Sequence, residues 1–297
     1  VILSQTEEAV SSAIVLDGTA CAKVVREALA QEVQAYVSRG LRRPGLAVVL
    51  VGDDPASKVY VKNKVLACKK TGIESQLHEL AADTSAEALL KLINQLNVDE
   101  NIDGILVQLP LPAALPTDEV LMAVAPSKDA DGLHPYNLGL LLCGKPGLRP
   151  CTPSGIMRLL DHYNIAVEGK HAVVIGRSNL VGKPISILLM ERNATVTMCH
   201  SRTRNLAEIC KTADILVVAA GKREMVLGSW LRPGSVVIDV GIHKTDKSES
   251  GLTGDVLYCE ARSVASHVTP VPGGIGPMTV AMLLSNTFAA YKRTHEA

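Results

Sequence analysis

The sequence predicts an α/β protein of two domains, each with a parallel sheet covered by helices. Along most of the 297-residue chain, apolar runs rich in Val and Ile alternate with helical patterns. Strands joined by helical crossovers of this kind pair in parallel and are buried on both faces. The alternation is interrupted by the turn-rich segment CGKPGLRPCTPSG (143–155). We therefore expect the boundary between the domains in that segment.

The first strand and helix of the first domain are predicted at GLAVVLVG and the segment after it. GLAVVLVG (45–52) is a continuous apolar run that favours a buried strand. A helix is expected to begin at Pro55, with Asp54 as its N-cap, and to end at Gly72.

Two more strands and one helix are expected before the boundary. The segment near 75–80 predicts a weak strand, and DGILVQLPLP (103–112) predicts a buried strand ended by prolines. Between them, residues 84–97 have a helical pattern, and Thr84 with Glu87 fits a capping box at its start.

The alternation begins again after residue 150. Strands are predicted at 171–176, 194–200, 214–220 and 235–241, with helices from Gly182 and near 206–212. The turn-rich TPVPGGIGP then separates a last helix, near 277–294, which we expect to pack back on the first half. The predicted domains are therefore residues 1–149, completed by 276–297, and residues 150–275.

The composition argues against several kinds of partner. Lys plus Arg and Asp plus Glu are 30 each, and aromatic residues are 3%, so neither nucleic acid nor an anionic membrane is expected to bind. The seven cysteines are scattered without a C-x-x-C pair, which predicts reduced thiols and no metal site. We expect a cytoplasmic protein, although a chain that starts at Val1 leaves a removed leader, and a mitochondrial location, open.

A nucleotide site is predicted in the second half, within HAVVIGRSNLVGKP. Gly176 stands at the end of a strand and Gly182 at the start of a helix, where backbone N–H groups can bind a phosphate. Ser178 and Val181 occupy the places of the other glycines of the usual dinucleotide fingerprint. Taken alone, this turn fits a purely structural role equally well.

The end of the next predicted strand indicates which cofactor would bind. NAD sites place an acidic residue there, but this strand ends in CHSRT, with His200, Ser201 and Arg202. Together with Arg177, these side chains suit a 2′-phosphate, which favours NADP. The alternative is that they are solvated loop residues.

Lys64 differs from the other lysines of the helix predicted from Pro55. At 100° per residue, one uncharged face contains Ser57, Tyr60, Val61, Lys64 and Cys68. Lys58, Lys62 and Lys69 lie on a different arc. A lysine that lines a pocket can take part in proton transfer. The alternative is a lysine whose stem lies along the helix edge and whose ammonium group reaches water.

Three further stretches could contribute to a site, and each has a structural alternative. Gln108 lies at the end of a predicted strand, where open α/β sheets bind ligands. Asp129 and Asp131 flank a loop that could bind a donor-rich ring or form an ordinary turn. TPVPGGIGPMT (269–279) could form a rigid wall for a substrate or only a tight connection.

Several of these stretches occur together in one enzyme family. SKVYVKNK, DGILVQLPLP, KDADG, RPCTPSG, VVIGRSNLVGKP, ATVTMCHSRT, GDV and TPVPGGIGPMTVAMLL, in this order, resemble the bifunctional methylenetetrahydrofolate dehydrogenase/methenyltetrahydrofolate cyclohydrolase family. The resemblance extends from about Leu16 to the C-terminal helix. It implies an N-terminal catalytic domain and a Rossmann-type NADP-binding domain, with folate in the cleft between them.

The resemblance also implies residue roles. Tyr60 corresponds to the tyrosine that stacks on the aminobenzoate ring of folate, and Lys64 to the catalytic lysine. Gln108 corresponds to the glutamine that assists this lysine, and Asp131 to the acid that binds the pterin. The remaining correspondences are, on the substrate side, Pro272, Gly273 and Gly274, and, for NADP, Gly176, Arg177, Ser178, Gly182, Ser201 and Ile242.

The activity that the resemblance implies has two steps. In the first, 5,10-methylenetetrahydrofolate is oxidised with NADP to the methenyl compound, and in the second this is hydrolysed to 10-formyltetrahydrofolate. One-carbon metabolism, purine biosynthesis and a homodimer are implied as well. The alternatives are an NAD-dependent mitochondrial-type member of the family, a shikimate-type dehydrogenase and a catalytically silent scaffold.

Overall fold

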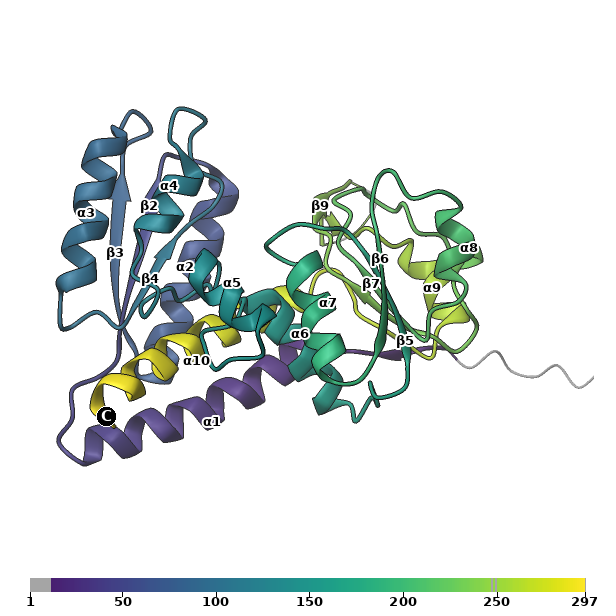
Figure 1. Cartoon of the computed structure of the whole chain (residues 1–297), viewed down its shortest axis with the longest axis horizontal. Helices are drawn as coiled ribbons and strands as arrows, with labels where there is room; N and C mark the ends of the chain where they lie inside the picture. Colours follow the sequence, from purple (N-terminus) through teal and green to yellow (C-terminus); the bar gives the residue numbers. More distant parts are fainter. Residues whose placement is uncertain (1–11, 247, 249, 297) are drawn as a thin grey trace, which may run out of the picture.

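Two α/β lobes lie side by side in the computed structural model, which describes residues 12–246, 248 and 250–296 (Figure 1). The long helices α1 (Gly18–Ser38) and α10 (Ile275–His295) run together along the lower side of the first lobe and reach the second. Among the described residues, no helix combines the length and the apolar character that crossing a bilayer requires.

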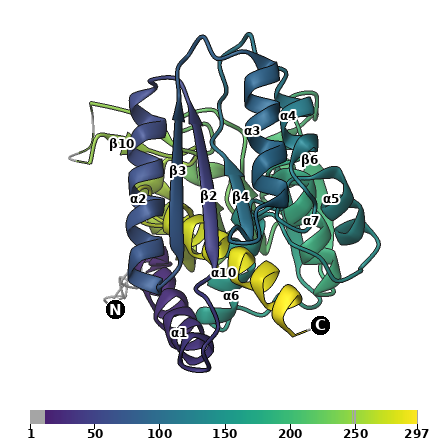
Figure 2. The same ribbon diagram turned by 90° about the vertical axis from the view of Figure 1, so that its left-hand side faces the viewer.

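The first lobe contains a three-stranded parallel sheet in the order β3-β2-β4. Its strands are β2 (Gly45–Val51), β3 (Glu74–Leu80) and β4 (Gly104–Val107). Every residue of β2 is buried, because alternate side chains pack into two different cores. One core faces α1, α2 (Pro55–Thr71) and α10, and the other faces α3 (Ala86–Val98) and α4 (Thr117–Ala123). Figure 2 shows this sheet between α2 and α3.

The second lobe contains a six-stranded parallel sheet. In spatial order its strands are β1 (Ile14–Val15), β11 (His267–Val268), β8 (Val236–Asp239), β7 (Ile215–Val218), β5 (His171–Ile175) and β6 (Thr195–Cys199). Its covering helices are α6 (Cys151–His162), α7 (Gly182–Glu191), α8 (Leu206–Cys210) and α9 (Tyr258–Val264). The smaller elements are α5 (Pro135–Leu142), a 3-10 turn at Gly228–Trp230 and the antiparallel pair β9 (His243–Lys244) and β10 (Leu252–Thr253).

The strand predictions are confirmed, with shorter bounds in several places. The run predicted at 103–112 forms a strand only over Gly104–Val107 and turns away before its prolines. The capping box with Thr84 is wrong: Ser85 is the N-cap of α3, and its hydroxyl accepts from the N–H of Ala88 at 3.2 Å. The helix starts one residue later than expected, so the hydroxyl that reaches its free N–H groups is that of Ser85.

The lobes do not divide at a single point in the chain. The short strand β1 pairs with β11 in the second sheet, although the sequence places it within the predicted domain 1–149. The last helix packs back on the first half, as expected, and also enters the second lobe. Met278 and Ala281 belong to the second lobe's core, whereas Leu284 and Phe288 belong to the first lobe's core.

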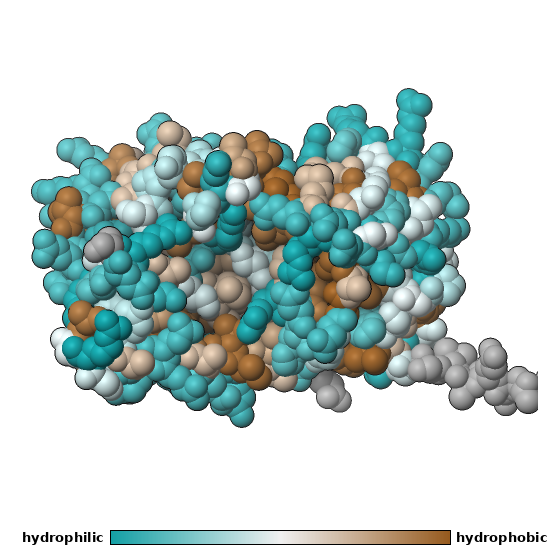
Figure 3. Space-filling model, turned by 60° about the horizontal axis from the view of Figure 1, so that its bottom comes forward, coloured by the Kyte–Doolittle hydropathy of each residue, from teal (hydrophilic) through white to brown (hydrophobic). Residues whose placement is uncertain are grey.

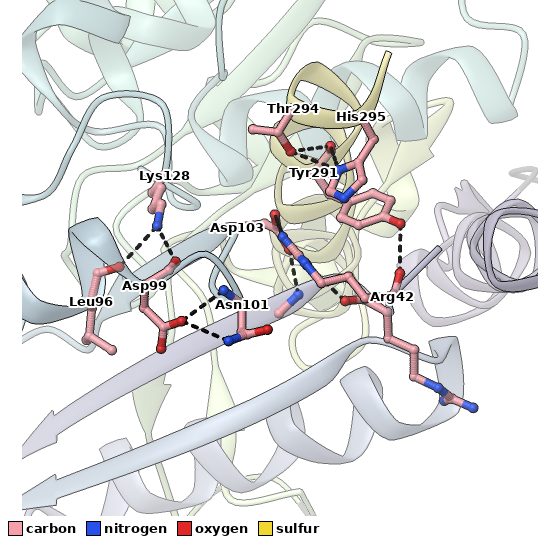
Figure 4. A network of polar contacts seen from close by, with 11 residues as sticks. Arg42, Leu96, Asp99, Asn101, Asp103, Lys128, Tyr291, Thr294 and His295 are labelled. Carbon is pink, nitrogen blue, oxygen red and sulfur yellow. Dashed lines mark hydrogen bonds and ion pairs between the residues drawn. The ribbon is translucent and has the colours of Figure 1, made fainter. Parts of the chain in front are cut away.

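A polar network anchors the other end of α10 to the first sheet (Figure 4). Asp103, just before β4, accepts two hydrogen bonds from Arg42 at 2.7 and 2.8 Å and one from the N–H of Gly45 at 2.8 Å. The hydroxyl of Tyr291 donates to the carbonyl of Arg42 at 2.7 Å. The network therefore ties together the starts of β2 and β4 and the end of α10.

The face on the side of α1 and α10 is mixed in character. In Figure 3, brown hydrophobic groups form small patches between teal hydrophilic ones. Large apolar patches mark surfaces for partners or membranes. The apolar patches on this face are small and scattered.

Candidate active site

A cleft of about 590 Å³ lies between the lobes. It is bordered by α1, α2, the chain after β8 and the segment that leads into α10. Residues that line it include Thr19, Arg26, Tyr60, Asn63, Lys70, Asp239, Gly241, Ile242, Pro272, Gly273 and Gly274. Five residues from the predicted site, Tyr60, Ile242, Pro272, Gly273 and Gly274, are therefore brought to one cavity.

Lys64 is buried and hydrogen-bonded. Its residue is 9% exposed, and its Nζ donates to Oε1 of Gln108 at 2.9 Å. The Nε2 of Gln108 donates in turn to the carbonyl of Leu109 at 2.5 Å, which fixes the orientation of the amide. The alternative of a lysine that reaches water is wrong, because the ammonium nitrogen itself takes part in a buried bond. The lysines on the other arc of α2 are exposed, as predicted, and these are Lys58, Lys62 and Lys69.

Tyr60 marks the edge of this buried face. It lies one turn before Lys64 on α2, is 40% exposed and lines the cleft. Lys64, one turn further along the helix, and Gln108, at the end of β4, are more enclosed. An exposed aromatic ring next to a buried amine and amide suits a flat, partly polar ligand.

The two aspartates after β4 have different roles. Asp129 is 6% exposed and accepts from the N–H groups of Gly132 and His134 at 3.1 and 2.8 Å. Its carboxylate therefore builds the loop. Asp131 is partly exposed, and burial by the surrounding protein raises its pKa, while the nearby charge of Lys64 opposes that rise. The structure thus brings Asp131 close to Lys64 and to the thiol of Cys151, which also lowers the pKa of this carboxyl through a hydrogen bond.

The Asp131 loop is supported from behind by α10. Asn286 is buried, and its Nδ2 donates to the carbonyls of Ala130 at 2.9 Å and Arg149 at 2.8 Å. The Sγ of Cys151 also donates to the carbonyl of Ala130, at 3.3 Å. Burial raises the pKa of this thiol well above its ordinary value, so Cys151 stays a donor.

The segment with Pro272, Gly273 and Gly274 packs directly on the start of α1. A Cβ on Gly18 would lie 1.7 Å from the carbonyl oxygen of Gly274, so only glycine fits there. The N–H of Thr19 donates to the carbonyl of Gly273 at 3.0 Å, and Gly273 has a φ of +101°. This contact makes the segment a fixed wall of the cleft.

The predicted phosphate turn forms after β5. Gly176 has a φ of +127°, and a Cβ on Gly182 would lie 2.2 Å from its carbonyl oxygen. The hydroxyl of Ser178 accepts from the N–H of Val181 at 3.2 Å, and α7 begins at Gly182 as expected. Such a tight turn at a helix start is typical of phosphate binding.

Side chains predicted to recognise a 2′-phosphate gather at one corner of the second lobe. The ends of β5 and β6 are paired, with Ile175 opposite Cys199, so Arg177 and Ser201 follow at the same edge of the sheet. Arg177, Ser201 and Ser178 are exposed. This corner lies away from the cleft lining formed by Tyr60, as expected for a long dinucleotide with two ends.

Two family models cover nearly the whole chain. The tetrahydrofolate dehydrogenase/cyclohydrolase catalytic domain matches residues 16–131, and the NAD(P)-binding domain of the same enzymes matches residues 150–295. The chain belongs to the tetrahydrofolate dehydrogenase/cyclohydrolase family.

Individual members of the family are similar over almost their full length. A protein from Magnetococcus marinus named bifunctional protein FolD is 56% identical over 95% of this chain and 98% of its own. The Campylobacter jejuni FolD methylenetetrahydrofolate dehydrogenase/cyclohydrolase structure has a TM-score of 0.91 and 44% identity, over 95% of this chain and all of that one. The Trypanosoma brucei FolD structure, in complex with NADP and an inhibitor, has a TM-score of 0.91 and 40% identity, covering 96% and 99%.

These comparisons also decide against one of the alternatives from the sequence analysis, a shikimate-type dehydrogenase. Shikimate dehydrogenase from Aquifex aeolicus shares only the architecture, with 13% identity and a TM-score of 0.50. The shikimate-type alternative is therefore wrong for this chain.

Sequence reasoning missed several residues of the family's cleft in this chain. Asp239, Asp255 and His243 form a polar cluster behind its second-lobe wall, and Asn286 supports the Asp131 loop. One signal was present for Asp239, which is an acid within the otherwise apolar run SVVIDVG. Asp255 lies in the stretch GDV that the family resemblance includes, but that resemblance gave it no role, and His243 stands alone in a loop-like segment.

Proposed function

We propose that this protein is a bifunctional enzyme, which oxidises 5,10-methylenetetrahydrofolate with NADP and hydrolyses the resulting 5,10-methenyltetrahydrofolate to 10-formyltetrahydrofolate. The observation that carries the proposal is the 2.9 Å bond between Lys64 and Gln108, with Asp131 nearby and the exposed Tyr60 at the edge of the cleft. The family membership of the whole chain supports both activities.

The folate is assigned to the inner end of the cleft. Asp131 presents a carboxylate to the donor groups of the pterin, and Tyr60 offers its ring to the aminobenzoate. Pro272, Gly273 and Gly274 form the opposite wall, whose rigidity favours one orientation of the bound ring system.

Lys64 is assigned the proton movements of the hydrolysis. Water adds to the methenyl carbon and loses one proton, which leaves a hydroxyl group. The bond from this carbon to N5 then breaks as N5 gains a proton, and the hydroxyl loses its own proton to become the formyl carbonyl, so that one proton is released overall. An amine at Lys64 can accept the first proton and return one to N5, while Gln108 holds the amine in place. Arginine keeps its charge at every relevant pH and could not replace it.

The residues of the second lobe fit NADP. Gly176 and Gly182 pack closely in a turn at a helix start, where backbone N–H groups can bind a pyrophosphate, and Arg177 with Ser201 offers donors to a 2′-phosphate. NADP held there would supply the acceptor for the hydride of the one-carbon bridge. Because this transfer needs no strong acid or base, the protein's part is to hold the two ring systems together.

The proposal extends to the domains, the assembly and the location of the protein. Residues 1–149 with 276–297 would form the folate domain and 150–275 the NADP domain, with β1 crossing into the second sheet. A homodimer is supported by β6, which stands at the open edge of that sheet. Light scattering tests the dimer, and a cytoplasmic location is tested by fractionation.

One assay tests the reaction. Purified protein receives methylenetetrahydrofolate with NADP, and NADPH and the methenyl compound are measured separately. We expect NADPH with transient methenyl accumulation, and a lower initial rate with NAD than with NADP. NADPH formation without later loss of the methenyl compound would contradict the proposed cyclohydrolase activity. A faster reaction with NAD than with NADP would favour the mitochondrial-type alternative.

A further inference from the structure

One wall of the cleft is held in place by two buried carboxylates, Asp239 and Asp255, which have no role in the proposed mechanism. This wall consists of residues 239–242, at the carboxyl end of β8, and Asp239, Gly241 and Ile242 all line the cleft. The side chain of Ile242 is 45% exposed. The N–H of Val240 still donates to the carbonyl of Val218 at 2.9 Å. Beyond Val240, the chain is held by the buried side chains beneath it.

Asp239 holds the wall from inside. Its residue is 3% exposed, and its carboxylate accepts from the N–H groups of Gly241 at 2.9 Å, Asp255 at 3.0 Å and Val256 at 2.9 Å. A Cβ on Gly254 would lie 1.9 Å from this carboxylate, so only glycine allows the approach. The turn at 254–256 is thereby bound to the end of β8.

Asp255 extends the support to the neighbouring strand and to β9. It is fully buried, and one carboxylate oxygen accepts from the N–H groups of Ala220 at 2.7 Å and Gly221 at 2.8 Å. The other oxygen accepts from Nε2 of His243 at 2.7 Å. Since His243 follows directly after Ile242, this bond fixes the exposed side of the wall.

This support reaches one side of the cleft only. Its members come from the ends of β7 and β8, from β9 and from the turn at 254–256, whereas Lys64 and Gln108 belong to the first lobe. The hydrogen bonds described for Asp239, Asp255 and His243 join segments of the second lobe. Ligands of parallel sheets bind beyond the carboxyl ends of the strands, so the wall faces the cofactor's side of the cleft.

We propose that His243 and Asp255 are positioning residues for hydride transfer, which hold the wall at Gly241 and Ile242 against the nicotinamide end of NADP. The inference rests on the proposed function. Hydride transfer depends on the distance and angle between two rings, so a small shift of this wall slows it. Hydrolysis of the methenyl compound needs Lys64 and water but no nicotinamide, so it is insensitive to the wall.

The protein's two activities provide the test. In His243→Ala, we expect the dehydrogenase kcat to fall by roughly ten- to a hundredfold, a size typical of misplaced reactants. The cyclohydrolase rate, measured on methenyltetrahydrofolate without NADP, is expected to stay within about twofold, because Lys64 retains its partners. NADP affinity, measured by calorimetry, is expected to change little, since the phosphate contacts lie at the far corner of the lobe.

Two further variants separate positioning from general stability. His243→Gln places an amide donor where Nε2 was and is expected to restore most of the dehydrogenase rate. His171→Ala is the matched control: this histidine of the same lobe also contacts two groups, Thr212 and Thr197, but lies away from the cleft lining. It is expected to leave the ratio of the two activities unchanged.

Several results would overturn the inference. These are an unchanged dehydrogenase rate in His243→Ala, a parallel fall of both activities, or a glutamine variant no better than alanine. If His243→Ala does not fold, His243→Asn is measured instead, and its cyclohydrolase activity reports that it has folded. A wild-type protein that does not reduce NADP would overturn the proposed function itself. If the wild type is active and the His243 variants have the same two rates as the wild type, only this inference is overturned.

Discussion

Lys64 and Gln108 are 44 residues apart in the chain, yet the ammonium nitrogen of one lies 2.9 Å from the amide oxygen of the other. The bond joins α2 to the end of β4, so a helix and a strand of the first lobe together position the amine. The amide is itself held by the carbonyl of Leu109. A buried lysine with one oriented partner is arranged for chemistry more than for solubility.

Replacing Lys64 by Met tests this arrangement directly. We expect Lys64→Met to lower the cyclohydrolase rate by at least about a hundredfold, because a positioned general base contributes that much or more. NADP affinity is expected to stay unchanged. Lys62→Met, on the exposed arc of α2, is the control and is expected to keep both activities. Near-normal hydrolysis by Lys64→Met would contradict the role.

The cofactor preference is tested at the end of β6. Ser201→Asp introduces a negative charge where the 2′-phosphate is expected, so the KM for NADP is expected to rise ten- to a hundredfold, the size of a lost charged hydrogen bond of about 1.5–3 kcal/mol. The KM for NAD is expected to fall or stay level. Ser263→Asp on α9 is a control at an exposed serine of the same lobe. Equal effects of the two substitutions would rule out specific phosphate recognition.

Asp103 is expected to matter for stability and not for catalysis. Its side chain is 3% exposed and satisfies Arg42 and the N–H of Gly45. Asp103→Ala leaves both donors without this acceptor, so the free energy of unfolding is expected to fall by about 2–4 kcal/mol in urea titrations. Asp161→Ala, which breaks an exposed pair with Arg192, is expected to lower it by less than about 1 kcal/mol. Similar losses in both variants would contradict this.

The raised pKa of Asp239 leads us to expect that the stability of the protein depends on pH. Burial raises the pKa of its carboxyl to about 6 from an ordinary value of 3.8. Between these two values the folded state binds more protons than the unfolded state, so this group's contribution to the free energy of unfolding decreases as the pH rises from 4 to 6. The total decrease is about 3 kcal/mol.

Asp239→Asn removes that contribution. Urea titrations of both proteins at several pH values from 4 to 7 are expected to show that the variant's stability relative to the wild type rises with pH up to about 6. The substitution also costs the variant an acceptor at every pH, since an amide has one oxygen. Curves that run parallel across this range would contradict the raised pKa.

The fold could be predicted largely from sequence because the central strands of both sheets are buried on both faces. The run Gly45–Val51 serves two cores at once and is therefore apolar throughout. The pairing of Ile14 with His267 could not be predicted, since two residues carry no periodic pattern and the partner lies far along the chain. Thr84 and Ser85 both have a hydroxyl that can cap a helix, and only the residue at which α3 begins decides which of them is the N-cap.

The part of the site on α2 could be predicted, because the spacing of residues along one helix shows which of them share a face. Helical geometry separated Lys64 from its neighbours, but it could not show that Gln108 accepts its bond. Likewise, the loop pattern alone offered Asp129 and Asp131 without a difference between them, and only the family resemblance singled out Asp131. The structure separates them, because Asp129 is occupied by backbone donors of its own loop.

The last helix has a consequence for how this protein is made. α10 contributes Met278 and Ala281 to one hydrophobic core and Leu284 and Phe288 to the other. Ribosomes synthesise the chain from its N-terminus, so residues 275–295 emerge after both sheets. Neither core can therefore be complete before these residues have been synthesised, and both lobes are expected to finish folding together, after α10 has emerged from the ribosome.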